Sequence, residues 1–220
     1  MQAYSFLLIN KFIYNFSVGE KTMIYSPDMT LREARNLYFR MNHFADDGGY
    51  ADRWIKVKVW HLPIWLPNTE GRRRAVKLHD IHHVLTEYPT TWRGEAEISS
   101  WEIGAGGLRR YYAGWWLDIM NVAQGLVVNP RGVYRGFVRG RRSTNLYSGE
   151  FTEELLTHRV GEYRQKLGLD IPEKDPEMAD SFLFAVWVLI SIAVYAVSLS
   201  LVLLPVVLPL TLIGVWVFSG

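Results

Sequence analysis

The chain has 220 residues, which is long enough for one domain with a proper hydrophobic core and an appended segment. It carries 24 Lys and Arg against 22 Asp and Glu, and the net charge of +2 is too small for a typical nucleic-acid-binding protein. No cysteine is present, which excludes disulfides, thiolate metal sites and cysteine nucleophiles. Any metal must therefore be bound by imidazole and carboxylate groups.

The first fifty residues predict one helix preceded by an apolar stretch. Residues 4–16, YSFLLINKFIYNF, lack the basic start of a signal peptide, and we expect them to pack on the core or to lie at a membrane surface. Thr30 and Glu33 match a capping box, in which two side chains satisfy free backbone amides at a helix start. The apolar positions that follow recur with helical spacing, so we expect a helix that ends before Gly48.

The middle of the chain predicts mainly helices. Residues 54–60, WIKVKVW, alternate like a strand but have no evident partner, which favours an extended connector ended by prolines. Helices are predicted from about residue 68 to 87, from about Trp92 onward, over residues 108–130 and over about residues 150–167. The expected fold class is therefore all-α, a helical bundle of roughly five or six helices.

An arginine-rich segment follows the long apolar helix. Residues 131–143, RGVYRGFVRGRRS, carry five arginines interleaved with Tyr134 and Phe137. The segment is either a solvated loop or a contact with anionic lipid headgroups, worth about 1 kcal/mol per basic residue near such a surface. RNA binding is disfavoured because the aromatic residues are few, and we expect no nucleic-acid partner.

The last forty residues carry no charged side chain. Residues 181–203 alone supply the ~20 consecutive apolar residues that span a bilayer as a helix. We therefore predict a helical domain over residues 1–180, a membrane-embedded tail over residues 181–220 without a packing role in that domain, and a membrane location. Pro205 and Pro209 each remove a backbone donor, so the tail either leaves the membrane as a kinked helix or folds back as a re-entrant hairpin.

The stretch KLHDIHHVLTEYPTTWRGE is the strongest candidate for a functional site. With His79 at zero on a helical wheel, His83 lies at about 40° and Asp80 at about 100°, so these side chains share one face, whereas His82 lies at about 300°. The chain reverses after this helix, which lets the next helix bring Glu95 opposite His83. Two imidazoles with one or two carboxylates suit Zn²⁺, Fe²⁺ or Mn²⁺; the alternative is an amphipathic helix with partly exposed histidines.

The same residues carry a family resemblance. His79-Asp80-x-x-His83, then eleven residues, then Glu95, resembles the signature of the coenzyme Q biosynthesis protein 4 family. The segments YPTTWRGE, GRRSTNLY and EELLTHRVGEYRQKLGLD are also similar to that family, so the resemblance covers roughly residues 30–170. It implies that His79, Asp80, His83 and Glu95 bind a divalent metal, zinc or iron, in the domain over residues 1–180. The apolar tail departs from the family, whose members end soon after the last helix and associate peripherally with membranes.

The resemblance implies a membrane-associated, metal-dependent protein of ubiquinone biosynthesis. It would act on polyprenylated benzoate-type precursors, by ring decarboxylation and hydroxylation at the same carbon, and would help to organise other enzymes of the pathway. Zinc has no redox chemistry, so an oxidative decarboxylation needs iron or an electron-rich phenol that itself reacts with oxygen. Two alternatives stay open: a non-catalytic isoprenoid-lipid-binding scaffold, in which the metal only links two helices, and a membrane-bound metallohydrolase.

The long apolar helix offers a place for the isoprenoid chain. Its start carries four aromatic residues, which either line a groove for the isoprenoid or pack in the core, and core packing is the more common role of such residues. They are Tyr111, Tyr112, Trp115 and Trp116.

Overall fold

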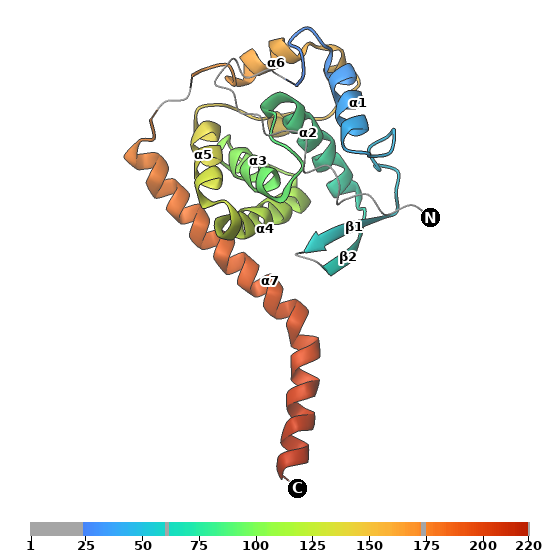
Figure 1. Cartoon of the computed structure of the whole chain (residues 1–220), viewed down its shortest axis with the longest axis vertical. Helices are drawn as coiled ribbons and strands as arrows, with labels where there is room; N and C mark the ends of the chain where they lie inside the picture. Colours follow the sequence, from blue (N-terminus) through green and yellow to red (C-terminus); the bar gives the residue numbers. More distant parts are fainter. Residues whose placement is uncertain (1–23, 60–61, 173–174, 220) are drawn as a thin grey trace, which may run out of the picture.

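The computed structural model describes residues 24–59, 62–172 and 175–219, and shows a helical body from which one long helix projects (Figure 1). The all-α prediction is confirmed, with one two-stranded hairpin added. The apolar stretch at residues 4–16 lies outside the described residues. The elements in chain order are α1 (Leu31–Met41), β1 (Trp54–Val59), β2 (Leu62–Pro67), α2 (Glu70–Thr86), α3 (Trp92–Gly104), α4 (Tyr112–Val128), α5 (Pro130–Arg141), the 3₁₀ turns η1 (Leu146–Ser148) and η2 (Leu155–Thr157), α6 (Val160–Leu167) and α7 (Met178–Ser219).

The first helix begins where the capping box predicts. The hydroxyl of Thr30 accepts a hydrogen bond from the backbone N–H of Glu33, and the carboxylate of Glu33 accepts one from the backbone N–H of Thr30 at 2.8 Å. α1 ends at Met41, because the side-chain amide of Asn42 donates to the carbonyl of Tyr38 at 2.8 Å and caps the last turn. Tyr38 is buried against α2, beside the site described below.

The helices α2 and α3 are joined by a short turn, as expected. Thr69 and Thr91 cap their starts, each accepting a hydrogen bond from a backbone N–H three residues on. Glu87 adopts a left-handed conformation (φ 60°) that ends α2. The start of α3 consequently lies beside the last turns of α2, and this juxtaposition places the site.

The arginine-rich segment is a helix, so the loop alternative is wrong, whereas its contact with anionic lipid headgroups stays a prediction. Asn129 caps α5, with Pro130 at the first helical position, and glycines recur every fourth residue. A Cβ on Gly136 would lie 2.5 Å from the carbonyl oxygen of Glu97 in α3, and one on Gly140 would lie 2.3 Å from that of Trp101. α3 and α5 therefore pack backbone against backbone, and this close contact outweighs the poor helix propensity of glycine.

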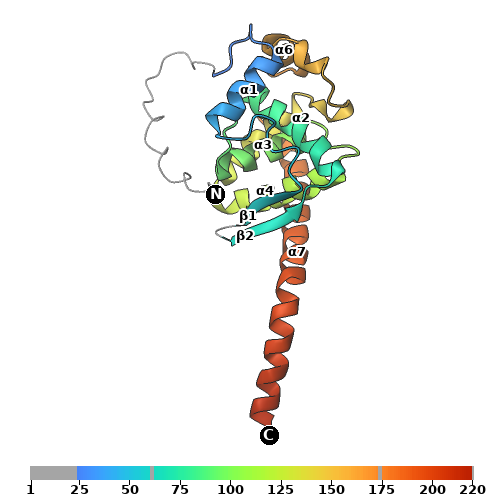
Figure 2. The same ribbon diagram turned by 90° about the vertical axis from the view of Figure 1, so that its right-hand side faces the viewer.

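The segment expected to be a connector is one strand of a hairpin. β1 pairs antiparallel with β2, with Trp54 opposite Pro67 and Lys56 opposite Trp65. The two prolines do not end the extended segment, because both lie within the second strand of a two-stranded sheet, whose outer edge needs no backbone donors. The hairpin lies at the lower end of the body in both views (Figures 1 and 2).

The final helix runs through both prolines of the tail. α7 is one helix of 42 residues, and its part Met178–Leu201 is long and apolar enough to cross a membrane. The helix continues past Pro205 and Pro209, so the re-entrant hairpin does not form. Each proline removes a single backbone donor, and the other backbone hydrogen bonds of α7 continue the helix.

The first half of α7 packs on the body, and the expectation that the tail has no packing role is wrong. Leu183, Phe184 and Trp187 pack against the buried cluster between α3, α4 and α5. The ring of Trp187 stacks on Trp115 with centroids 5.4 Å apart, and Arg142 bonds Asp180 at 2.9 Å at the helix start. Only the second half of α7 projects away from the body (Figure 1).

Candidate metal centre

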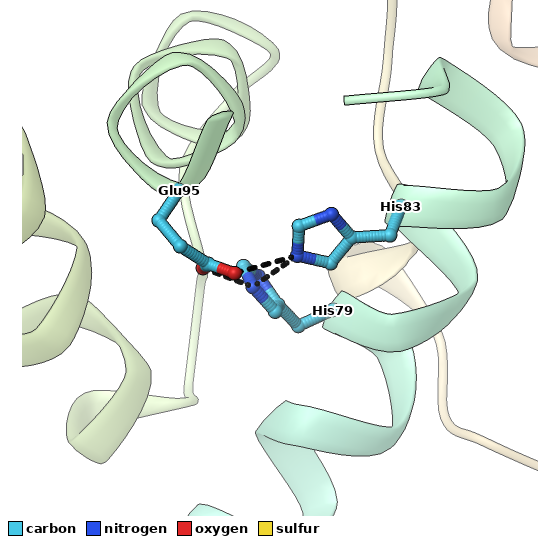
Figure 3. A group of neighbouring side chains, drawn as sticks. All are labelled: His79, His83 and Glu95. Atoms are coloured by element: carbon cyan, nitrogen blue, oxygen red, sulfur yellow. Dashed lines mark hydrogen bonds and ion pairs between the residues drawn. The ribbon is translucent and has the colours of Figure 1, made fainter. Parts of the chain in front are cut away.

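Three of the four predicted ligands converge on one point. His79 and His83 lie one turn apart on α2, and Glu95 lies in the first turn of α3 and points at both rings (Figure 3). His79 Nε2 and His83 Nε2 are 3.1 Å apart, and each lies 3.3 Å from an oxygen of the Glu95 carboxylate. The helical wheel and the chain reversal predicted this arrangement of His79, His83 and Glu95.

The spacing of these atoms fits a metal ion. Ligands held tetrahedrally on zinc at bonds of 2.0–2.1 Å lie about 3.4 Å from one another, close to the separations observed here. His83 Nδ1–H donates to the carbonyl of Tyr88 at 2.8 Å, and His79 Nδ1–H donates to the carboxylate of Glu102 at 2.9 Å. With their protons held at Nδ1, both neutral rings direct the Nε2 lone pair at the common point.

Glu102 lies directly behind the site and was not predicted. Its Oε1 atom accepts hydrogen bonds from His79 Nδ1–H, from His82 Nδ1–H at 2.6 Å and from the hydroxyl of Tyr147 at 3.1 Å. His82 accepts the backbone N–H of Leu146 at Nε2, which fixes the proton of this ring at Nδ1. Such a carboxylate behind a metal-binding histidine orients the ring and raises its basicity.

A second carboxyl group lies behind Glu102. Asp118 of α4 is buried, and burial together with the neighbouring Glu102 raises the pKa of Asp118 well above its ordinary value. Asp118 Oδ2 and Glu102 Oε2 have no hydrogen-bond partner among the described residues, and a protonated Asp118 could donate to Glu102. The set His79, Glu102 and Asp118 could also hold a metal ion, but a protonated Asp118 is a poor ligand.

Asp80, the fourth predicted ligand, is held away from the converging atoms. Its oxygens accept hydrogen bonds from the hydroxyls of Tyr50 at 2.5 Å and Tyr38 at 3.4 Å. Burial raises the pKa of Asp80, although the bond from Tyr50 and the charges of His79 and His83 oppose the shift. The ring of Tyr38 stacks on His83 with centroids 5.5 Å apart. Asp80 thus holds the hydroxyl of Tyr38, and the Tyr38 ring in turn packs against the ring of His83.

The carboxylates of Glu95 and Glu102 make the site favourable for a positive charge. Burial disfavours the charged form of His79, but the charge and hydrogen bond of Glu102, together with Glu95, raise the pKa of His79 well above its ordinary value. Burial likewise opposes ionisation of Glu95, yet His83 and His79 hold the pKa of this carboxyl well below its usual range. A cation at the common point would replace the His79 proton between two carboxylates.

The site opens to solvent on the side of Glu95. The side chain of His83 is 1% exposed, that of His79 17% and that of Glu95 29%. A surface pocket of about 420 Å³ lies elsewhere, between η1 and α6, and none of the three converging residues lines it. Of the four aromatic residues at the start of α4, Tyr111 is buried and Trp115 packs in the body, whereas Tyr112 and Trp116 are exposed.

No protein-family model matches this chain, and neither a curated protein nor a solved structure shows significant similarity to it. The resemblance to the coenzyme Q biosynthesis protein 4 family therefore rests on the motifs alone.

Proposed function

We propose that this chain is a membrane-anchored metalloprotein that binds one divalent cation through His79, His83 and Glu95. The convergence of two Nε2 atoms and a carboxylate within 4.8 Å of one another supports this function best. Three protein ligands leave a coordination position for substrate or water, as in catalytic rather than structural zinc sites. The same set, two histidines and one carboxylate, also suits iron.

We propose further that the substrate is a polyprenylated benzoate-type precursor of ubiquinone. The motif resemblance supports this substrate, and α7 supports it independently, because a polyprenyl chain resides in the bilayer to which such a helix would tether the site. The bound cation would polarise the ring carboxylate or phenolic oxygen of the substrate. The chain's own contribution is to orient His79 through Glu102 and His83 through Tyr88, so that both rings present Nε2.

The test uses the full-length protein in detergent, loaded with zinc or with iron(II). A prenylated 4-hydroxybenzoate labelled at the carboxyl carbon should release its label as carbon dioxide, and Glu95→Ala should lose both metal and release. Glu97→Gln, on the same helix but bonded to Asn129, should retain both. A protein that binds the metal stoichiometrically but releases no label with either ion would refute the catalytic assignment.

A non-catalytic scaffold is the second candidate, and one observation favours it. The ligands come from two consecutive helices, so a bound ion would cross-link α2 to α3 and stabilise the fold. In that case the metal should raise the melting temperature of the protein, and quinone synthesis in cells should follow the stability of Glu95 variants. Rescue of quinone synthesis by a metal-free but folded Glu95 variant would select the scaffold.

A further inference from the structure

The hairpin β1–β2 has little support from the body. Among the described residues the two strands pack chiefly on each other, and the side chains of Trp54 and Trp65 are 52% and 61% exposed. A two-stranded hairpin that packs on nothing is marginally stable in water. Two large exposed aromatic side chains on such an element indicate a contact with an apolar partner.

The register of the hairpin separates two kinds of residue. Positions 55, 57 and 59 of β1 pair with positions 66, 64 and 62 of β2, and all six are Ile, Val or Leu. The other positions carry Trp, Lys and Pro, and the Lys56 ammonium lies 5.7 Å from the ring centroid of Trp65. Tryptophan beside lysine is characteristic of side chains at the boundary between hydrocarbon and headgroups.

The hairpin lies where the long helix leaves the body. Both views place it beside α7 at the lower end of the body (Figures 1 and 2). Ser198 of α7 accepts a hydrogen bond at 3.2 Å from the indole N–H of Trp116 in α4, so α7 still contacts the body at this residue. From Ser198 to the end of α7 at Ser219 the helix extends roughly 30 Å, at 1.5 Å per residue, which matches the hydrocarbon thickness of a bilayer.

The outward face of the first half of α7 is also apolar. Leu183, Phe184 and Trp187 face the body and pack on α4 and α5. Phe182, Leu189, Ile192 and Val197 are exposed on the opposite side of the helix. Leu199, Leu201, Leu203 and Leu204 are exposed as well, so the exposed apolar surface of α7 continues past the part that packs on the body.

We propose that the hairpin β1–β2 is a second membrane contact, which places Trp54 and Trp65 among the lipid headgroups beside the point where α7 enters the bilayer. The inference rests on the membrane anchor of the proposed function, and it adds the depth at which the body sits relative to the bilayer. Because the first half of Met178–Leu201 packs on the body, α7 crosses the hydrocarbon with residues after Ser198, and the exposed Trp116 of α4 lies at the same boundary. The second contact fixes the rotation of the body about the axis of α7, which the helix alone would leave free.

The absence of cysteine permits a direct test. Single-cysteine variants of the full-length protein, Trp65→Cys, Lys56→Cys, Leu199→Cys and Glu153→Cys, are labelled with an environment-sensitive fluorophore. They are reconstituted in mixed phosphatidylcholine–phosphatidylglycerol vesicles whose lipids carry a nitroxide quencher near the headgroup or near the chain end. Lys56→Cys keeps Trp54 and Trp65. Glu153 bonds Arg32 of α1, which lies in the upper part of the body in both views, and so reports on a surface away from the hairpin (Figures 1 and 2).

The proposal expects severalfold stronger quenching at positions 65 and 56 than at position 153, with the headgroup nitroxide more effective than the deep one. If position 199 is quenched while positions 65 and 56 resemble position 153, the hairpin proposal is overturned and the anchor stands. If position 199 is not quenched, the anchor of the proposed function fails together with the hairpin contact. A probe at position 65 that is shielded from solvent but not quenched would indicate a protein partner, and would also overturn the proposal.

Discussion

Glu102→Gln should weaken metal binding, and by an amount that depends on pH. The substitution keeps the size of the side chain and an oxygen that accepts from His79 and His82, but removes the negative charge behind the His79 ring. Loss of such a partner behind a ligand typically costs 10–100-fold in metal affinity, or about 1.4–2.7 kcal/mol. Glu102→Ala would instead leave the donors of His79, His82 and Tyr147 without an acceptor. The protein would then lose stability, and the loss of metal binding could not be separated from unfolding.

The pH dependence follows from the raised pKa of His79. In the metal-free protein a proton on His79 competes with the metal, so apparent affinity should rise by about tenfold per pH unit until the pH exceeds that pKa. Glu102→Gln lowers the pKa of His79, so its affinity curve flattens at a lower pH. The difference between the two proteins should therefore be small near pH 6 and reach its full value on the alkaline side.

The assay is a competition titration of zinc against a chromophoric chelator, using the full-length protein in detergent at several pH values. Glu97→Gln is the matched control, since Glu97 lies on the same helix and bonds Asn129 at 2.7 Å rather than a ligand of the site. Near-ultraviolet circular dichroism checks that each variant retains its packing. Equal affinities at every pH, or a difference that shrinks as the pH rises, would refute the role assigned to Glu102.

Three further outcomes test other parts of the structure. Gly136→Ala should lower the free energy of unfolding by about 1–3 kcal/mol, because its Cβ would meet the backbone of α3, whereas Gly71→Ala, with open space around it, should be neutral or stabilising in chemical denaturation. Arg164→Ala should cost about 3–5 kcal/mol in the same measurement, since the buried guanidinium pairs with Glu87 and bonds the carbonyls of Leu85 and Val84. The metal-free protein should lose stability as the pH falls below about 4.5, because the lowered pKa of Glu95 contributes stability only while this carboxylate stays ionised; thermal melts of Glu95→Gln should show a weaker acid dependence.

The candidate site was predictable because its determinants are local. Helical spacing places His79 and His83 on one face, and the turn at Pro89 brings back Glu95 within twelve residues of His83. Glu102 could have been found by the same rule, since it follows Glu95 by seven residues and so lies two turns along the same face of α3. Its partners His82 and Tyr147 could not, because they lie twenty and forty-five residues away and contact Glu102 only through tertiary packing.

The errors in the fold have different physical causes, and none could be read from the local sequence. The glycines and arginines of residues 131–143 are typical of a loop, yet Gly132, Gly136 and Gly140 form a smooth stripe that admits the backbone of α3. In the hairpin, six consecutive residue pairs join β1 to β2, and the turn between them lies outside the described residues. The tail was expected to break at Pro205 and Pro209, but each proline removes only one backbone donor, and α7 continues through both.

Packing also connects the candidate site to the proposed membrane anchor without a flexible joint. α7 contacts α5 through Phe184, whose ring lies 5.5 Å from that of Phe137. A Cβ on Gly104 would lie 2.4 Å from the carbonyl oxygen of Phe137, so the end of α3 packs directly on the backbone of α5. Glu95 and Glu102 belong to this same helix. Because packed interiors transmit displacement with little compression, the height and tilt of α7 in a bilayer would set the height and tilt of the metal centre. A substrate whose reactive ring is held near the headgroups by its polyprenyl chain would then meet a site at a fixed depth, which a tether of unstructured chain could not provide.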